Sequence, residues 1–274
     1  MEKKNNRRAY IVMSILSVFI AFPVVWMILM SIRPNAEIFS VPPHIIPKKF
    51  TLQAYRAIFT DSKTLRFFFN SYFIGIVVTL VSLFLGILSG YGFSRFRFKG
   101  KKIMNVFIIM SQTIPPISLL IPYYIMIVSF KLYNTYTGLV ITYASFCLPY
   151  CMLMMISYFN TISEQIDEAV IIDGGSRFYA LWRVLVPIAI PGIVSTAIYS
   201  FMLSWNEYLF ALTLTKSDVM RTVPIGISLL QGENQTNWSV MMSMAIVGSV
   251  PILILYLVAQ KYFVSGLSAG SVKG

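Results

Sequence analysis

Six long apolar segments constrain the fold of this chain more than any other feature of its sequence. A helix needs about 20 mostly apolar residues to cross a hydrocarbon core about 30 Å thick. The 274 residues are 57% hydrophobic and 12% charged, whereas about a quarter of a typical soluble domain is charged. The sequence therefore predicts an all-α membrane protein, one domain over residues 1–274. The expected spans lie near 10–32, 71–94, 104–128, 137–159, 188–214 and 240–262.

Prolines interrupt several of these segments and predict kinks. Pro115 and Pro116 lie inside the third segment, Pro149 in the fourth and Pro251 in the sixth. A proline in a helix removes one backbone hydrogen bond, so the freed carbonyl needs another partner. Kinked helices of this kind are typical of a transport pathway.

The basic residues indicate how the chain is oriented in the membrane. The net charge of +12 does not indicate nucleic-acid binding, because the basic residues lie beside apolar segments. There they anchor the protein to anionic lipid and set its topology. The clusters contain Lys3, Lys4, Arg7 and Arg8 before the first span, and Arg95, Arg97, Lys99, Lys101 and Lys102 after the second. The positive-inside rule places both clusters, and with six spans both termini, in the cytoplasm. The loop 33–69 also carries basic residues, but they are spread out and partly offset by acids.

A polar stretch, DEAVIIDGGSRFYALWRVLVPIAIPG (167–192), separates the fourth and fifth segments. The six charged residues from 164 to 183 would together cost about 15–20 kcal/mol at the centre of a bilayer. The stretch therefore lies outside the membrane, on the cytoplasmic side. Thr161 and Glu164 have the spacing of a capping box, and we expect a helix from there to about Ile172.

The glycines in this stretch predict a turn between two helices. Asp173-Gly174-Gly175 should end the first helix, because glycine adopts the left-handed conformation that terminates helices. Ser176 can cap a second helix, which Pro187 should close. The apolar face of that helix would contain Phe178, Leu181, Trp182 and Leu185. From these residues alone, a docking site for a protein partner and a plain surface linker both remain open.

The same stretch resembles the cytoplasmic coupling loop, called the EAA loop, of binding-protein-dependent ABC importer permeases. The family pattern is Glu-Ala-Ala, then Asp-Gly-Ala-Ser, then Leu-Pro. The chain departs from it with Val170 and Gly175 in place of alanines, Val186 in place of leucine, and Ser163 in place of a frequent proline. The resemblance implies a coupling loop made by Glu164, Asp167, Glu168, Ala169, Asp173, Gly174, Gly175, Ser176, Phe178 and Pro187.

Nearly the whole chain shares this resemblance, most closely with the maltose-type carbohydrate branch. The segments are NSYFIGIVVTL (70–80), GYGFSRFRFKG (90–100), SWNEYLFAL (204–212) and GLSAGSVKG (266–274). The resemblance implies a permease in a bacterial cytoplasmic membrane that works with a second permease, two cytoplasmic ATP-binding subunits and an extracytoplasmic solute-binding protein. The loop between spans five and six would face the binding protein, and the C-terminal tail would reach the ATPase.

The chain itself is not expected to be an enzyme or to hold a cofactor or metal. It contains no G-x-x-x-x-G-K-[ST] loop, so energy from ATP has to come from a separate subunit. Cys147 and Cys151 lie four residues apart without a companion histidine, which favours a helix contact over a metal site. The sequence has no clustered histidines or cysteines and no paired carboxylates in a span, so it does not support an integral-membrane enzyme.

Glu207 is the one charged residue well inside the six segments. The resemblance implies that Trp205, Asn206 and Glu207 lie at the outer gate or contact the binding protein. The alternative is an interfacial residue whose carboxylate extends to the membrane surface. A secondary, ion-coupled transporter is the main alternative function, but such proteins usually carry several intramembrane acids. The sequence does not identify the sugar.

Overall fold

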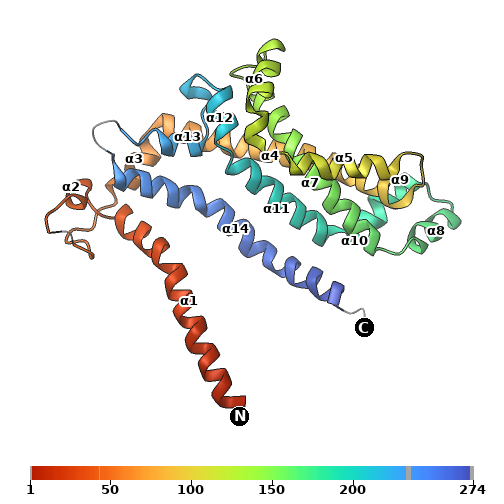
Figure 1. Cartoon of the computed structure of the whole chain (residues 1–274), viewed down its shortest axis with the longest axis horizontal. Helices are drawn as coiled ribbons and strands as arrows, with labels where there is room; N and C mark the ends of the chain where they lie inside the picture. Colours follow the sequence, from red (N-terminus) through yellow and green to blue (C-terminus); the bar gives the residue numbers. More distant parts are fainter. Residues whose placement is uncertain (1, 43, 233–235, 272–274) are drawn as a thin grey trace. The chain divides into compact units, whose positions relative to one another are not determined.

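A computed structural model describes residues 2–42, 44–232 and 236–271 of the chain (Figure 1). Helices are its regular elements, and the described residues contain no strand. The predicted all-α membrane fold is confirmed. Four helical segments are long and apolar enough to cross a membrane alone, at 9–31, 62–95, 136–161 and 238–257. Two bent helix pairs raise the possible number to six, so the exact number of spans stays a prediction.

The chain divides into two compact units, which are described separately. Unit one comprises residues 1–65 and 226–251, and unit two comprises residues 66–225 and 252–274. Unit one contains α1 (Glu2–Ser31), α2 (Asn35–Ile38) and α3 (Gln53–Thr60). Two long helices, α4 (Ser62–Arg95) and α14 (Trp238–Ser271), contribute residues to both units. The single-domain prediction is not tested by this division and stays a prediction.

The third predicted span is two helices with a sharp bend between them. α5 (Lys101–Thr113) is followed by the short 3-10 helix η1 (Pro116–Leu119) and by α6 (Leu120–Ser129), and the two parts meet at 97°. The prolines cause this break, because a residue that precedes proline is driven out of the helical conformation. Ile114 and Pro115, which each precede a proline, are both extended. The predicted interruption at this point is confirmed.

The region of the fifth predicted span, 188–214, is not one continuous helix, and the span itself stays a prediction. A first break lies at Ala189, where the helical stretch 177–188 meets α11 (Ile190–Trp205) at 79°. A second break follows at Asn206, before the short helix α12 (Leu209–Leu214). Hydropathy misses the first break, because the residues around Ala189 are as apolar as the helices themselves, whereas the polar pair Asn206 and Glu207 lies at the second break.

Small residues let α4 and α7 (Tyr136–Thr161) approach closely in unit two. A Cβ atom added to Gly86 would lie 2.9 Å from the Cβ of Cys151, and one added to Gly90 would lie 2.6 Å from the Cβ of Met155. Helices in membranes pack through such positions, because dispersion contacts replace the hydrophobic driving force there. Cys147 and Cys151 are fully buried at this level, so their predicted role as helix-contact residues is confirmed.

Candidate functional site

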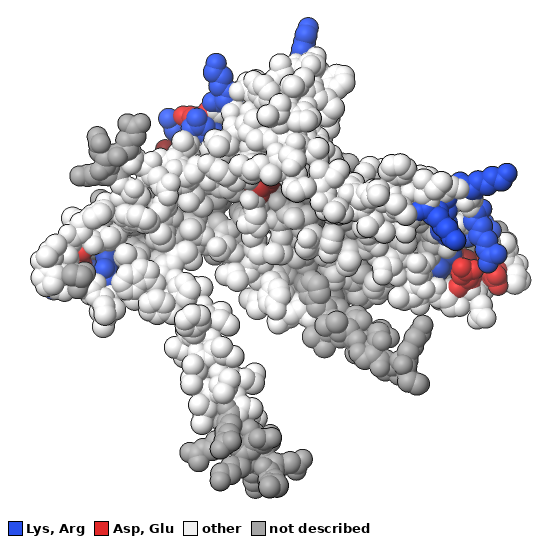
Figure 2. Space-filling view, in the orientation of Figure 1, with Lys and Arg blue, Asp and Glu red and all other residues white. Residues whose placement is uncertain are grey.

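The polar stretch after α7 forms a helix, a turn and a second helical segment. The first helix is α8 (Gln165–Ile172), and the second segment runs through α9 (Arg177–Tyr179), the π-helix η2 (Ala180–Leu185) and α10 (Val186–Ile188). We call residues 163–189 the coupling loop, after the loop that it resembles. In the space-filling view, acidic residues gather over α8 beside a group of lysines and arginines (Figure 2).

The turn of the coupling loop has the hydrogen bonds of a Schellman motif. Gly174 has a φ of +81°, its N–H donates to Ile171 O at 3.0 Å, and the Gly175 N–H donates to Val170 O at 2.8 Å. These bonds satisfy carbonyls at the end of α8 that have no partner within the helix. A Cβ atom added to Gly174 would meet nothing within 4 Å. The turn therefore needs a residue that tolerates positive φ, and the space around it is open.

The predicted helix ends at Thr161 and at Pro187 differ from the structure, and the predicted start at Ser176 agrees with it. Thr161 does not cap α8, because it is the last residue of α7 and its hydroxyl donates to Tyr158 O at 2.7 Å. The Ser163 hydroxyl accepts the Gln165 N–H at 3.3 Å instead. The Ser176 hydroxyl does cap the second helix, accepting the Tyr179 N–H at 3.1 Å. This cap was predicted.

Pro187 does not close the second helix, which continues to Ile188. The π-helix before it provides the reason. The Val186 N–H bonds to Leu181 O, five residues back, so the helix is wider just where the proline ring would otherwise crowd a carbonyl. The bend therefore comes later, at Ala189, shortly before Pro191.

Two departures from the family pattern lie against each other in this loop. A Cβ atom added to Gly175 would lie 2.7 Å from Cγ1 of Val170 and 2.9 Å from its carbonyl oxygen. The valine at position 170 therefore occupies the space that an alanine at position 175 would use. The larger residue at one position and the smaller residue at the other compensate.

Most of the predicted coupling residues are exposed, and one is not. The residues at 164, 168, 169, 173, 174, 176, 178 and 187 are exposed, and Gly175 is half-buried. Asp167 is only 4% exposed, and its Oδ2 atom pairs with Nε of Arg95 at 2.7 Å. Its carboxylate therefore serves the interior of unit two rather than the surface. From the sequence, Arg95 is indistinguishable from the other basic residues that set the topology.

Apolar side chains lie among the exposed acids of the coupling loop. Ile172 is 84% exposed and Phe178 is 70% exposed, with Ile171 and Tyr179 also on the surface. The sequence predicts Phe178 on the same apolar face as Leu181 and Leu185. In the structure the two leucines are buried and Phe178 is not. It lies in the first turn of the second segment, with its ring 6.1 Å from the half-buried Trp182. The surface thus combines negative charge with apolar area.

The second candidate region, at Trp205, Asn206 and Glu207, is organised by internal contacts. The Glu207 carboxylate accepts the N–H groups of Phe210 at 2.8 Å and Ala211 at 2.9 Å, which caps α12. Trp205 is 4% exposed, with its ring 4.8 Å from Tyr72. Asn206 is exposed, and its side-chain amide donates to Met202 O at 2.8 Å. An interfacial role with the carboxylate extended to the membrane surface does not match this geometry.

Two asparagines that were not among the predicted site residues hold the segment after α12. Asn134 Oδ1 accepts the backbone N–H groups of Lys216 and Ser217 at 2.8 and 3.0 Å. The Asn70 side chain donates to Val219 O at 2.8 Å and to Arg221 O at 2.7 Å, and accepts from the Tyr136 hydroxyl at 2.6 Å. An asparagine inside the apolar run FFFNSYF was the available signal, because a buried amide needs partners.

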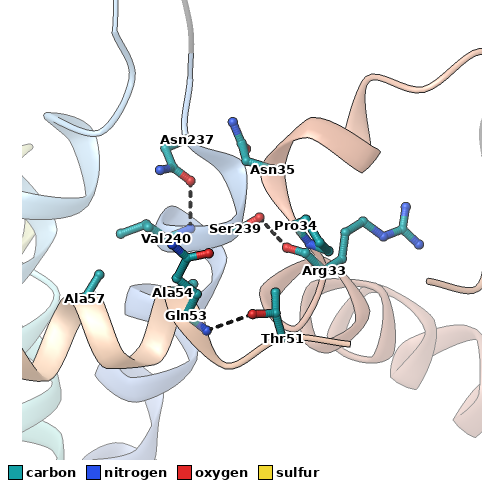
Figure 3. A pocket seen from close by; sticks show the side chains of 10 residues that line it. All are labelled: Arg33, Pro34, Asn35, Thr51, Gln53, Ala54, Ala57, Asn237, Ser239 and Val240. Carbon is teal, nitrogen blue, oxygen red and sulfur yellow. Dashed lines mark hydrogen bonds between the residues drawn. The ribbon is translucent and has the colours of Figure 1, made fainter. Parts of the chain in front are cut away.

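Unit one contains a cleft of about 280 Å³, shown in Figure 3. Its lining is Arg33, Pro34, Asn35, Thr51, Gln53, Ala54, Ala57, Asn237, Ser239 and Val240. Its polar groups bond largely to one another, as in the hydrogen bond from the Ser239 hydroxyl to Arg33 O at 2.6 Å. The Arg33 guanidinium extends away from the other lining residues in Figure 3 and donates to Ile45 O at 2.8 Å. No predicted site residue lines this cleft.

The predicted contact between the C-terminal tail and an ATPase falls partly outside the described residues. The tail comprises residues 266–274, and the structure describes the chain only to Ser271.

Comparison with known proteins identifies relatives over nearly the full length of the chain. The sequence model of the family described as "Binding-protein-dependent transport system inner membrane component" matches residues 82–269. The sulfoquinovosyl glycerol transport system permease protein SmoH of Agrobacterium fabrum is 35% identical over 97% of this chain and 93% of its own length. The trehalose/maltose transport system permease protein MalG of Thermococcus litoralis is 34% identical over 95% of this chain and 94% of its own.

A solved structure shares the fold. A chain in the crystal structure of a bacterial ABC transporter involved in the import of the polysaccharide alginate superposes with a TM-score of 0.83. It is 20% identical, and the match covers 96% of this chain and 97% of that chain.

Proposed function

Since the chain belongs to the family of binding-protein-dependent transport system inner membrane components, we propose that the solute it helps to import is a carbohydrate. The relatives named for sulfoquinovosyl glycerol and for trehalose and maltose support this substrate class. The chain is a multi-pass membrane permease, and in this proposal a second permease completes the pathway while an extracytoplasmic binding protein delivers the sugar.

ATP hydrolysis is assigned in this proposal to two cytoplasmic subunits that grip the coupling loop. ATP binding closes the ATPase pair and draws the coupling loops of the two permeases together. The spans then change from an inward-open to an outward-open arrangement, which is coupling through a rigid element with two positions. Both termini and the coupling loop lie in the cytoplasm in this arrangement, as the basic clusters indicate.

The exposed surface of the coupling loop is the observation that carries the docking proposal. Three acids, Glu164, Glu168 and Asp173, lie exposed near the apolar side chains of Ile172 and Phe178. Anionic lipid repels such a surface, whereas a protein groove with basic and apolar residues fits it. Gly174 leaves open space at the turn, so a partner can approach the backbone there.

The test compares two glycines that have the same local conformation. Gly174 and Gly100 have φ values of +81° and +88°, and an added Cβ meets nothing within 4 Å at either position. An aspartate therefore imposes similar backbone strain at both, roughly 1–2 kcal/mol. We expect Gly174→Asp to insert normally but to lose ATPase co-purification and uptake by at least about tenfold, or about 1.4 kcal/mol of docking free energy.

Gly100→Asp is the matched control and should retain both activities. If the same amount of ATPase co-purified with both variants, the coupling loop would not be the docking site. The substrate class is tested separately, by competition of unlabelled carbohydrates against labelled sugar uptake in vesicles that contain the complete transporter. Uptake that no carbohydrate inhibits would contradict the sugar assignment.

A further inference from the structure

The basic residue at the end of α4 differs from its neighbours in the sequence. Arg97 and Lys99 are exposed, as the positive-inside rule expects of residues that face the cytoplasm. The side chain of Arg95 is 4% exposed, and so is buried beneath the coupling loop. A buried guanidinium is retained only where its donors are well satisfied.

Arg95 donates to groups in two other helices of unit two, α8 and α7. Its Nε atom pairs with Asp167 in the first turn of α8 at 2.7 Å. Its Nη1 atom donates to Phe159 O and its Nη2 atom to Ile162 O, each at 3.0 Å, at the end of α7. Because Arg95 is itself the last residue of α4, one side chain joins α4, α7 and α8.

The electrostatics of the three helix ends favour this arrangement. The last carbonyls of a helix lack partners within it and carry partial negative charge, which a guanidinium neutralises at the end of α7. A carboxylate in the first turn of a helix is favourable for the opposite reason, and Asp167 occupies that place in α8. The planar guanidinium also fixes directions that a lysine ammonium would not fix.

Further contacts join the same helices around Arg95. The Ser94 hydroxyl donates to Asn160 Oδ1 at 2.8 Å, which connects α4 and α7 a second time. The guanidinium of Arg177, in α9, lies 5.0 Å from the centre of the Phe96 ring. The base of the coupling loop is thus fixed to α4 and α7, whereas its tip around Ile172 and Gly174 is exposed.

We propose that Arg95 is a positioning residue that makes α8 move as one body with α4 and α7, so that a displacement of the coupling loop reaches the spans. This inference rests on the proposed function. In it, one buried ion pair transmits the movement of the coupling loop, which the ATPase causes, to the spans that form the pathway. A loop held only by apolar contacts would tilt on its base when the tip is pulled. The Arg95 contacts favour one orientation, because the three guanidinium nitrogens meet four acceptors at fixed angles: Asp167 Oδ2, Phe159 O, Ile162 O and Ser94 Oγ.

The test replaces both Arg95 and Asp167, in order to distinguish a role in transmitting movement from a role in stabilising the fold. A buried ion pair exchanged for apolar residues of similar volume often leaves stability unchanged, whereas removal of one partner is strongly destabilising. The variants are Arg95→Met, Asp167→Leu, their combination, and Arg95→Lys, with exposed Arg97→Met as the matched control. Each is purified with its ATPase subunits and second permease and reconstituted with the binding protein and sugar.

The readout is the number of sugar molecules transported per ATP hydrolysed, measured beside assembly and Tm. We expect the double variant to assemble, with a Tm closer to that of the wild type than the Tm of either single variant, and to transport about five- to tenfold less sugar per ATP. Arg95→Lys should also lower the ratio, because one ammonium cannot serve Asp167 and both carbonyls in the same geometry. Arg97→Met should keep the wild-type ratio.

A wild-type ratio in the assembled double variant would overturn the inference. If that variant does not assemble, Arg95→Lys decides the matter, since it retains the charge and an unchanged ratio in it overturns the inference equally. Failure of the proposed function would look different, because the wild-type complex itself would then show no ATP-dependent uptake.

Discussion

The coupling loop and the segment from Asn206 to Val223 both interrupt the apolar helices of unit two, and they use their acidic residues in opposite ways. In the coupling loop, Glu164, Glu168 and Asp173 are exposed, and of its acids Asp167 alone is buried. In the second segment, the Glu207 carboxylate caps α12 and Asp218 pairs with Arg221 at 2.7 Å. Acidic residues thus mark a candidate docking surface only where the chain itself does not use their oxygens.

The two regions also differ in how they are attached to the helices. The buried guanidinium of Arg95 and the contacts around it fix the base of the coupling loop and leave its tip exposed. The side-chain amides of Asn70 and Asn134 instead bind the backbone of the second segment at several points along its length. The first attachment suits an element that a partner moves, and the second suits a surface that stays in place.

The largest expected effect is on the attachment of the second segment, through Asn70→Leu. This change leaves Arg221 O without its donor, and leaves Val219 O and the Tyr136 hydroxyl with only the contacts that Arg66 makes. An unsatisfied buried group costs about 1–3 kcal/mol and each of the two other lost hydrogen bonds about 0.5–1.5 kcal/mol, so the free energy of unfolding should fall by about 2–6 kcal/mol. Thermal unfolding in detergent measures the loss, and proteolysis within residues 215–223 should accelerate.

The control for Asn70 is Asn206→Leu in the same region. Asn206 is exposed, and the one hydrogen bond that its side chain donates goes to Met202 O. Its replacement should therefore change the Tm little. Two equal Tm values would show that the amide contacts of Asn70 do not hold the segment.

Variants of Glu207 and Glu168 test whether the acids of the two regions have different roles. Glu207→Ala removes a cap from α12 and should cost about 1–2 kcal/mol of stability, with impaired uptake but intact ATPase co-purification. Glu168→Ala removes an exposed acid and should do the reverse, weakening co-purification without changing the Tm. If both variants changed the same property, the two regions would not differ in the way argued.

The smallest expected effect is the coupling energy between the side chains at positions 170 and 175. Gly175→Ala alone places a methyl group 2.7 Å from Val170 Cγ1, and should lower stability by about 1–3 kcal/mol, as in other overpacked sites. Adding Val170→Ala removes that contact and restores the family pattern. A double-mutant cycle on the unfolding free energies should give a coupling of about 0.5–1.5 kcal/mol. Additive changes would mean that the two departures arose independently.

Several elements of the fold could be predicted because they depend on nearby residues only. The left-handed turn at Gly174 and the Ser176 cap follow from what glycine and serine do to an adjacent backbone. The interruption at Pro115 likewise follows from a missing N–H and a steric restriction. The capping box at Thr161 failed because α7 continues to Thr161, two residues beyond the predicted end at 159, so the residue is already part of that helix.

The sequence by itself determined the membrane class, the helical architecture, the family resemblance and the polar loop between spans four and five, since each of these depends on composition or on residues close together in the chain. Tertiary structure decided which charges stay available to partners. Arg95 and Asp167 are 72 residues apart, and Asn70 lies 149 residues from Val219. Burial and pairing are properties of neighbours in space, so the sequence cannot tell a buried Asp167 from an exposed Glu168 beside it, although the two acids serve opposite purposes.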